Sequence, residues 1–226
     1  PSKPLCSAAA FIHDLGLVEE MAAAIGNTTV AARVSQLRSS TASAFNAIWL
    51  RNGTYASSRQ TELALPLWLG IVPDSARDAV IDNLVREIEA HEWHVTTGIV
   101  GTRALFEALG LIGRTDVALR LLTQTSYPSY GYMVANPHEP STTLWENWAA
   151  DHLDNDQADA SRNHIMFGTI SAFLWKHIAG LKPQEAGWRR VIVAPSAGEL
   201  CGAAANSEVD PKVAADSEVD PKVAAD

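Results

Sequence analysis

Residues 26–48 read G-N-T-T-V-A-A-R-V-S-Q-L-R-S-S-T-A-S-A-F-N-A-I, and this stretch indicates the kind of fold. A Gly-Asn pair, which ends helices, is followed by two threonines that can each cap a new helix. Apolar and small side chains then recur in steps of three and four, which predicts a helix over 30–48. The predicted apolar stripe consists of Val30, Val34, Leu37, Thr41, Ala44 and Ile48.

The residues on both sides of this helix also carry structural signals. A helix over 5–25 precedes it, with an apolar face made of Phe11, Leu15, Val18, Ala22 and Ile25. Because the connecting turn is short, the two helices should form an antiparallel hairpin. Asn52 and Gly53 follow, a dipeptide that favours a tight turn and a small two-stranded hairpin.

More helix pairs are predicted further along the chain. Helical patterns cover 60–70, a segment opened by Pro73, 102–112, 116–123 and about 163–179. The pattern over 60–70 is apolar nearly all round, so this helix should be buried, with Pro66 kinking or shortening it. Residues 191–193 are a β-type run, V-I-V. Consecutive helix pairs with short links predict an all-α fold, a toroid or solenoid of helix hairpins.

The composition fits a globular domain and argues against some partners. Hydrophobic residues make up 47% of the 226 residues, and the formal net charge is −9. Residues 207–216 and 217–226 are identical copies of S-E-V-D-P-K-V-A-A-D, so they carry −4 of this charge and we expect a disordered tail. A mildly acidic chain without a basic run is no nucleic-acid binder. No apolar run reaches the roughly 18 residues that cross a membrane.

Cysteine usage and the termini say little about the compartment. Cys6 and Cys201 lie far apart, so we expect free thiols, and we expect neither a metal nor another cofactor. The first residues lack the basic segment and apolar core of a signal peptide, and they suggest a chain cut from a longer protein. Sequons at Asn27 and Asn52 hint weakly at secretion.

Residues 127–148 are the best candidate for a binding surface. They read Y-P-S-Y-G-Y-M-V-A-N-P-H-E-P-S-T-T-L-W-E-N-W, without a clean period, and hold three of the chain's four tyrosines. Glu146 lies between Trp145 and Trp148, and poorly solvated surroundings of this kind raise the pKa of a carboxyl group and suit proton transfer. Aromatic rings also pack on sugars, so a carbohydrate site fits. The alternative is a glutamate that caps a helix or pairs with an arginine.

Histidines and aspartates offer weaker signals. His91-Glu92-x-His94 resembles half of a zinc motif, but the spacing is wrong and no ligand cluster accompanies it. We therefore interpret His94 as a hydrogen-bonded residue or part of a site rim. His164 stands at the predicted start of the last helix, where it can face a ligand hydroxyl or serve as a cap. Four aspartates between 151 and 159 lack the glycine and glutamate of a calcium loop and are interpreted as a solvated loop.

Six motifs follow one another in an order that resembles a known family. They are T-T-G-I-V-G-T-R-A-L-F-E-A-L, G-R-T-D-V-A-L-R-L-L, Y-P-S-Y-G-Y-M, T-T-L-W-E-N-W, N-H-I-M-F-G and G-W-R-R-V-I-V-A-P. The succession, over about 60–195, resembles the C-terminal part of the catalytic domain of bacterial and fungal α-L-rhamnosidases, glycoside hydrolase family 78. The resemblance implies an incomplete (α/α)6 barrel over 1–186, the start of a truncated β-sandwich over 187–200 and a repeat tail over 207–226.

The resemblance also implies a reaction and its residues. The family hydrolyses terminal α-L-rhamnose with inversion, which needs an acid and a base roughly 6.5–9.5 Å apart. The glutamate of its W-E-x-W motif is the general base, which corresponds to Glu146 here. The sugar-binding histidine of N-H-x-x-F-G corresponds to His164, and Trp145, Trp148 and Tyr132 would be substrate-binding neighbours.

The sequence departs from the family in three places. The family's general acid lies upstream in a motif of the type D-x-x-x-E-R-x-x-W-x-G-D, and no such string occurs here. Asn147 and Tyr130 replace a common Arg and Trp of the family motifs. We therefore expect a fragment that retains the base, lacks the acid and has little activity alone. A non-catalytic carbohydrate-binding or antigenic fragment, and another helical-hairpin glycosidase or lyase, are the alternatives; the aglycone and the oligomeric state stay open.

Overall fold

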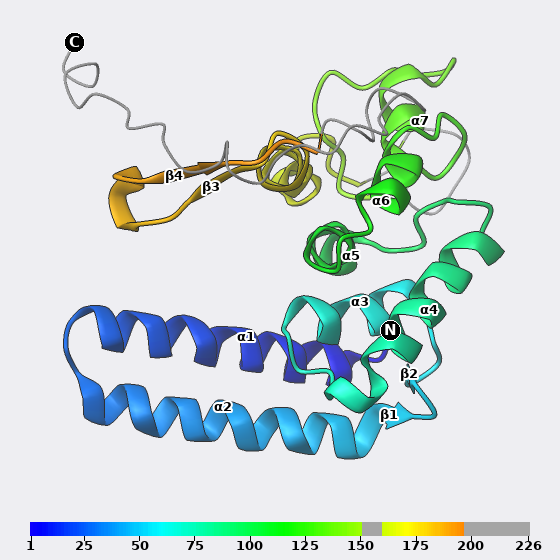
Figure 1. The fold of residues 1–226 in the computed structure, drawn as a ribbon. Coiled ribbons are helices and arrows are strands. Elements are labelled where there is room, and N and C mark those ends of the chain that lie inside the picture. The colour runs from blue at the N-terminus through cyan, green and yellow to red at the C-terminus, as the bar shows by residue number, and fades with distance from the viewer. Residues whose placement is uncertain (151–159, 197–226) are drawn as a thin grey trace, which may run out of the picture. The chain divides into compact units, whose positions relative to one another are not determined.

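The computed structural model describes residues 1–150 and 160–196, which fall into two units that divide between Gly168 and Thr169. Figure 1 shows the elements of each unit along the chain. The four aspartates of 151–159 and the repeats of 207–226 lie outside the described residues. The domain limits at 186 and 200 therefore stay a prediction. No helix in the described part of the chain has both the length and the hydropathy to cross a membrane.

Helices α1 (Lys3–Ala24) and α2 (Thr28–Trp49) form the predicted antiparallel hairpin (Figure 1). Gly26 takes φ = 76°, which suits the turn between them. The cap of α2 is Asn27, whose Oδ1 accepts a hydrogen bond from Val30 N at 3.1 Å. The two threonines that follow lie inside the helix, so the prediction that one of them is the cap was wrong by one residue.

The predicted apolar faces of this hairpin are largely exposed. In α2 the buried residue is Phe45, while Val30, Leu37 and Ile48 of the predicted stripe are exposed. In α1, Leu15 and Ala22 are buried as predicted, but Phe11, Val18 and Ile25 are exposed. The period identified the helices correctly but not their buried side. Amphipathicity shows that a face can be buried, and burial also needs a neighbouring element, which the described residues do not supply here.

The Asn52-Gly53 prediction is confirmed by strands β1 (Leu50–Arg51) and β2 (Thr54–Tyr55), which pair antiparallel. Both turn residues have positive φ, 49° and 73°, as a two-residue hairpin turn of this hand requires. The turn delivers Tyr55 into the core, where its hydroxyl donates to Asn46 Oδ1 at 2.6 Å. The hairpin therefore fastens the chain to α2 before α3 begins.

Two further helix pairs follow, α3 (Gln60–Trp68) with α4 (Asp74–Ala90), and α5 (Ile99–Leu111) with α6 (Thr115–Leu122). Helix α3 is buried along nearly its whole length, as predicted, and packs against both α4 and α5. Pro66 lies inside its last turn without breaking it. Helix α3 is therefore the centre of the first unit.

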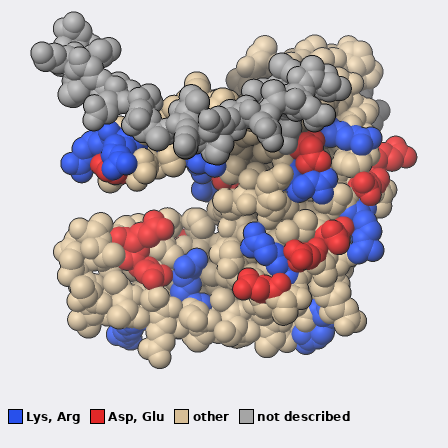
Figure 2. Space-filling view, viewed as in Figure 1, with Lys and Arg blue, Asp and Glu red and all other residues tan. Residues whose placement is uncertain are grey.

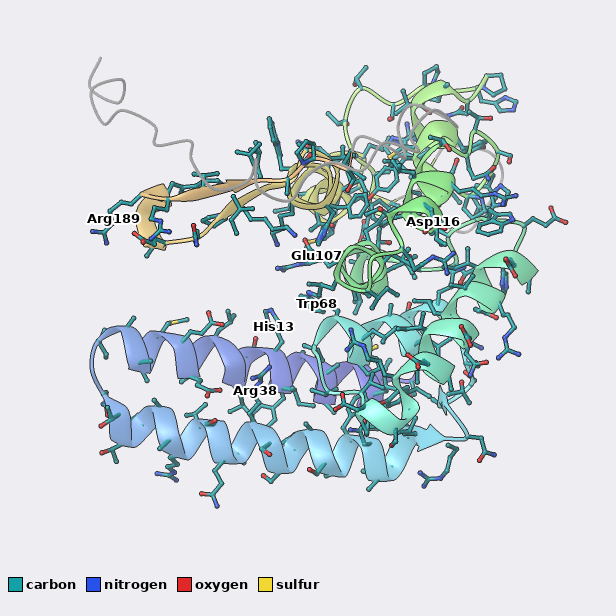
Figure 3. The ribbon with its side chains drawn as sticks, in the orientation of Figure 1. His13, Arg38, Trp68, Glu107, Asp116 and Arg189 are labelled. Atoms are coloured by element: carbon teal, nitrogen blue, oxygen red, sulfur yellow. The ribbon has the colours of Figure 1, made fainter. Side chains whose placement is uncertain are left out.

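Helices α1, α3 and α5 meet at one aromatic ring. His13 of α1 stacks on Trp68 of α3 with ring centroids 4.9 Å apart, and both side chains are labelled in Figure 3. Arg103 of α5 lies over the same indole ring, 5.0 Å from its centroid. Cation–π contacts of this kind add to the attraction between packed helices. The surface is otherwise mixed in charge, and Figure 2 shows no continuous basic patch on the visible face of the described residues.

The last predicted helix, over about 163–179, is three shorter pieces. These are η1 (Ile165–Thr169), a 3₁₀-helix; α8 (Ile170–Phe173); and η2 (Leu174–Ile178), a π-helix. The first helical residue is Ile165, and the residue before it is paired with the W-E-N-W segment, since His164 N donates to Leu144 O at 2.8 Å. The helix prediction was therefore right in type but wrong in regularity.

In the second unit, β3 (Leu181–Pro183) pairs antiparallel with β4 (Val191–Val193) in the register Leu181↔Val193. This confirms the β-type run at 191–193. The short 3₁₀-helix η3 (Ala186–Trp188) joins the two strands. Before them, Gly180 takes φ = 69° and ends the helical segment, as predicted.

At Gly101 helix α5 closely approaches helix α3. A Cβ added there would lie 2.9 Å from both Cβ and Cγ2 of Thr61, and closer still to Oγ1. Since the contact is with the branch point of a stiff side chain, the two helices would have to separate to accept a methyl group.

We predict that Gly101→Ala lowers the free energy of unfolding by about 1–2 kcal/mol, because overpacking outweighs the gain in helix propensity. Gly98→Ala is the matched control, since a Cβ there meets nothing within 4 Å. It should lose less than about 1 kcal/mol as an N-cap change. Urea unfolding followed by circular dichroism measures both, and equal losses would contradict the close approach.

Candidate active site

The motif that contains Glu146 runs alongside the segment that contains His164. Leu144 O accepts from His164 N at 2.8 Å, and Glu146 N donates to Ser161 O at 2.8 Å. The hydroxyl of Thr143 also donates to the backbone carbonyl of Arg162. These bonds join residues 15 to 20 positions apart in the sequence. The two residues predicted to act on the sugar are therefore neighbours on paired backbone segments.

The paired segments are irregular and do not form a sheet. Among the described residues, strands occur in the pairs β1–β2 and β3–β4, and none covers 143–146 or 161–164. The two backbone bonds and the bond from Thr143 therefore hold Glu146 and His164 on neighbouring stretches of irregular chain.

The carboxylate of Glu146 is held by one oxygen. Oε2 accepts a hydrogen bond from Ser161 N at 2.9 Å, and the residue is partly exposed. Within residues 1–150 and 160–196, no hydrogen bond reaches Oε1. The arginine nearest in sequence to this bond, Arg162, pairs with Glu139 instead. The arrangement fixes the carboxylate and leaves an oxygen that can accept a proton from water.

The two tryptophans of the motif are buried and anchor it. Trp145 is 2% exposed and Trp148 is 7% exposed. The Trp148 ring stacks on Phe167 with centroids 4.0 Å apart, and Tyr130 meets Trp148 edge-on at 5.1 Å. Tyr130 in turn donates its hydroxyl hydrogen bond to Phe167 O at 2.8 Å. This cluster holds the backbone of Glu146 from beneath, so the tryptophans support the carboxylate more than they surround it.

Gln60 is a residue that the sequence reading missed. It is fully buried at the first position of α3, its Nε2 donates to His94 O at 2.9 Å, and its Oε1 accepts from Thr96 N at 2.9 Å. Thr97 follows Thr96, and its backbone oxygen accepts a hydrogen bond from Trp148 Nε1 at 2.6 Å. The segment before α5 is thus held on one side by Gln60 and on the other by the W-E-N-W motif. The sequence does offer a signal for this role of Gln60, which is a polar residue at the start of an otherwise apolar helix.

His94 takes the hydrogen-bonded role predicted for it. Its Nε2 lies 2.7 Å from Ser126 Oγ, and its Nδ1 lies 3.3 Å from His91 O. Tyr132, another predicted site residue, is partly exposed and meets Tyr127 edge-on at 5.3 Å. The described residues hold no group of three or more His, Cys, Asp or Glu side chains that could bind a metal ion.

Comparison with known proteins identifies the family. The sequence profile of the bacterial alpha-L-rhamnosidase six-hairpin glycosidase domain matches residues 1–178 of the 226. The chain belongs to the α-L-rhamnosidase family. This confirms the resemblance drawn from the six motifs, and it confirms a largely helical, incomplete (α/α)6 fold within a glycoside hydrolase family.

Individual rhamnosidases align with nearly all of the chain. The α-L-rhamnosidase of Streptomyces avermitilis is 35% identical over 208 residues, which is 90% of this chain and 20% of that protein. The α-L-rhamnosidase of Alteromonas sp. strain LOR is 31% identical over 213 residues, 92% of this chain and 23% of that protein. The chain thus spans about a fifth of the length of the curated relatives it matches.

Solved rhamnosidase structures share the fold. The crystal structure of the Streptomyces avermitilis enzyme complexed with L-rhamnose gives a TM-score of 0.76, covering 83% of this chain and 18% of that one at 35% identity. The native enzyme from Aspergillus terreus gives a TM-score of 0.80, covering 86% of this chain and 23% of that one at 30% identity. The rhamnosidase hairpins are therefore retained in this chain.

We predict that Gln60→Ala lowers the free energy of unfolding by about 2–4 kcal/mol, because two backbone groups lose their partner inside the rhamnosidase domain. Gln60→Glu keeps an acceptor for Thr96 N but places an oxygen against His94 O, so it should cost at least as much. Gln36→Ala, at an exposed position of α2, is the control and should change little. Urea unfolding compares the three variants. An unchanged free energy of unfolding for Gln60→Ala would contradict the stabilising role of its two hydrogen bonds to the 94–96 segment.

Burial raises the pKa of Tyr130 well above the usual range, and it does the same for Tyr55. Above a pH of about 10 the unfolded chain releases these two protons while the folded chain retains them. The contribution of the two tyrosines to the free energy of unfolding is therefore complete below that pH and is lost as the pH rises above it. Tyr130→Phe should reduce the alkaline slope of the free energy of unfolding by about 1.4 kcal/mol per pH unit. Urea unfolding between pH 9 and 11.5 tests this, with Tyr55→Phe expected to act alike; unchanged slopes would contradict it.

Proposed function

We propose that this chain is the base-bearing part of an inverting α-L-rhamnosidase, acting on glycosides that end in α-L-rhamnose. Glu146 deprotonates the water that attacks the anomeric carbon, and His164 binds a sugar hydroxyl. The general acid is supplied by a part of the enzyme outside this sequence. Trp145, Trp148 and Tyr132 belong to the same site as its supporting and neighbouring aromatic residues.

The observation that carries the proposal is the backbone pairing of 143–146 with 161–164. It brings Glu146 and His164 together although the sequence separates them by eighteen positions. A general base must be fixed within reach of its water and must keep an acceptor free. The hydrogen bond from Ser161 N to Oε2 fixes the carboxylate of Glu146, and Oε1 is available to accept a proton. Similarity to an α-L-rhamnosidase solved with L-rhamnose supports the choice of sugar.

One feature of the sequence supports the part of the proposal that places the general acid elsewhere. The family's acidic motif does not occur in the 226 residues. An inverting enzyme uses its acid to protonate the leaving oxygen, which contributes about 10²–10⁴-fold to the rate. A substrate whose leaving group needs little protonation reduces this requirement. The base can therefore be tested in the chain as it stands.

We predict that the chain hydrolyses α-L-rhamnopyranosyl fluoride but has little activity on alkyl rhamnosides. Water attacks C1, the C–F bond breaks, fluoride leaves and Glu146 takes the proton, so β-L-rhamnose forms first. Glu146→Gln should lower the rate by about 10²–10⁴-fold. Glu89→Gln, at an exposed position of α4, is the matched control and should leave the rate unchanged. A fluoride electrode gives the rate, and proton NMR gives the first anomer.

Two outcomes would sink the proposal. If α-L-rhamnose forms first, the reaction is retaining and Glu146 is not the base of an inverting mechanism. If Glu146→Gln matches the parent chain, the carboxylate has no catalytic part. L-Rhamnose binding without fluoride release would favour the other candidate, a carbohydrate-binding fragment.

A further inference from the structure

We propose that one face of the α1–α2 hairpin binds the same face of a second copy of this chain. Two stripes of apolar side chains, the outer stripes, make up this face, and each side chain is between 39% and 80% exposed. They are Phe11, Val18 and Ile25 on α1 and its C-cap, and Val30, Leu37 and Ile48 on α2. This association does not depend on the function proposed above.

Both outer stripes point away from the rest of the first unit. His13 of α1 stacks on Trp68, and Asn46 of α2 donates to Ile71 O at 2.7 Å, so these side chains mark the packed side of each helix. At about 100° per residue, the centre of each stripe lies about 140–170° around its helix from His13 or Asn46. The stripes therefore share one side of the hairpin. Figure 1 shows that the end of the hairpin with the α1–α2 turn projects beyond α3 and α4.

The area of this face suits one further copy of the chain. Each of the two helices has 22 residues. At about 1.5 Å per residue each is about 33 Å long, and packed helices lie about 8–10 Å apart, so the face covers about 600 Å². A specific interface needs about 500–800 Å² on each partner. Monomeric proteins seldom leave a larger apolar patch in contact with water.

Charge decides which helix of one copy lies on which helix of the other. Helix α1 has a formal net charge of −2, from three acidic residues and one lysine, and α2 has +2, from two arginines. The residues are Lys3, Asp14, Glu19 and Glu20 in α1, and Arg33 and Arg38 in α2. If α1 of each copy lies on α2 of the other, opposite charges meet twice, because a two-fold axis makes the two contacts identical. Packing of α1 on α1 would bring like charges together.

The two-fold arrangement also fixes the level at which the stripes meet. Within the hairpin, Gly16 lies beside the Arg38 side chain, since a Cβ added at Gly16 would be 3.4 Å from Arg38 Nε. Because the helices are antiparallel, Val18 is then close to the level of Leu37. A two-fold axis parallel to the helices keeps each level and places α1 over α2 of the other copy. Val18 therefore meets Leu37 across a four-helix bundle whose neighbouring helices are antiparallel.

The test is sedimentation equilibrium of the 226-residue chain, whose monomer has a mass of 24.3 kDa. The mass should double as the concentration rises, with a Kd of about 10 µM, because interfaces of this size bind in the micromolar range or more tightly. Leu37→Glu should weaken the dimer by about 100-fold, since it places a carboxylate at the centre of the buried face. Circular dichroism of the dilute chains should be the same, because Leu37 is exposed in the monomer.

Leu111→Glu is the matched control for this change. Leu111 is exposed to a similar degree, 55% against 45% for Leu37, but it lies on α5 and outside both outer stripes. It should leave the Kd unchanged. A chain that stays monomeric at every concentration overturns the proposal, and other residues of the same polypeptide would then have to cover the face. Equal weakening by the two glutamates overturns it as well.

Cysteine cross-linking tests the orientation, in chains whose Cys6 and Cys201 are replaced by serine. A mixture of Val18→Cys and Leu37→Cys chains should form mainly mixed disulfides on oxidation, because the two side chains meet across the interface. Val18→Cys chains alone should form few. Disulfides that form equally well within each variant would contradict the packing of α1 on α2.

Discussion

The close approach of α3 and α5 at Thr61 and Gly101 is the constraint on which the rest of the first unit depends. It sets the two helix starts side by side, so that Gln60 can reach the segment that leads into α5. An amide side chain offers a donor and an acceptor at fixed separation, and here both meet backbone groups of 94–96. A wider spacing between the helices would leave these groups without partners, at a cost comparable to that of a core cavity.

The 94–97 segment in turn supports the motif that carries the Glu146 carboxylate. Thr97 O receives the indole N–H of Trp148, and the ring of Trp148 lies flat on Phe167. Since Phe167 follows His164 by three residues, the aromatic cluster fixes both sides of the pairing that carries the candidate site. The aromatic side chains thus stabilise the structure of this segment, and the partly exposed polar groups that they position, Glu146 and His164, can contact a ligand. Tryptophans beside a carboxylate do not by themselves make it desolvated.

Much of this arrangement was predictable because local signals agree with the tertiary structure. The Gly-Asn stop, the Asn-Gly turn and the β-type run at 191–193 each depend on the backbone preferences of a few adjacent residues. Helix faces were harder: Val30, Leu37 and Ile48 of α2 obey the helical period, yet they are exposed. Which face is buried depends on a neighbouring element, and a local period contains no information about that neighbour. The pairing of the segment before the final helix was missed for the same reason, since the partner of His164 N is Leu144 O, twenty residues earlier in the sequence.

The candidate site draws on parts of the chain that sequence order keeps apart. Gln60, the 94–97 segment, the W-E-N-W motif and His164 are linked by hydrogen bonds that run from one connection to the next. In consecutive helix hairpins, alternate connections lie at the same end, so the segments that lead into α3 and α5 meet there. Function at that end can vary by changing connections while the helix packing stays the same. The same logic explains why the proposed base, Glu146, depends on a remote glutamine: the W-E-N-W motif has no regular structure, and the helices supply its rigidity through the 94–97 segment.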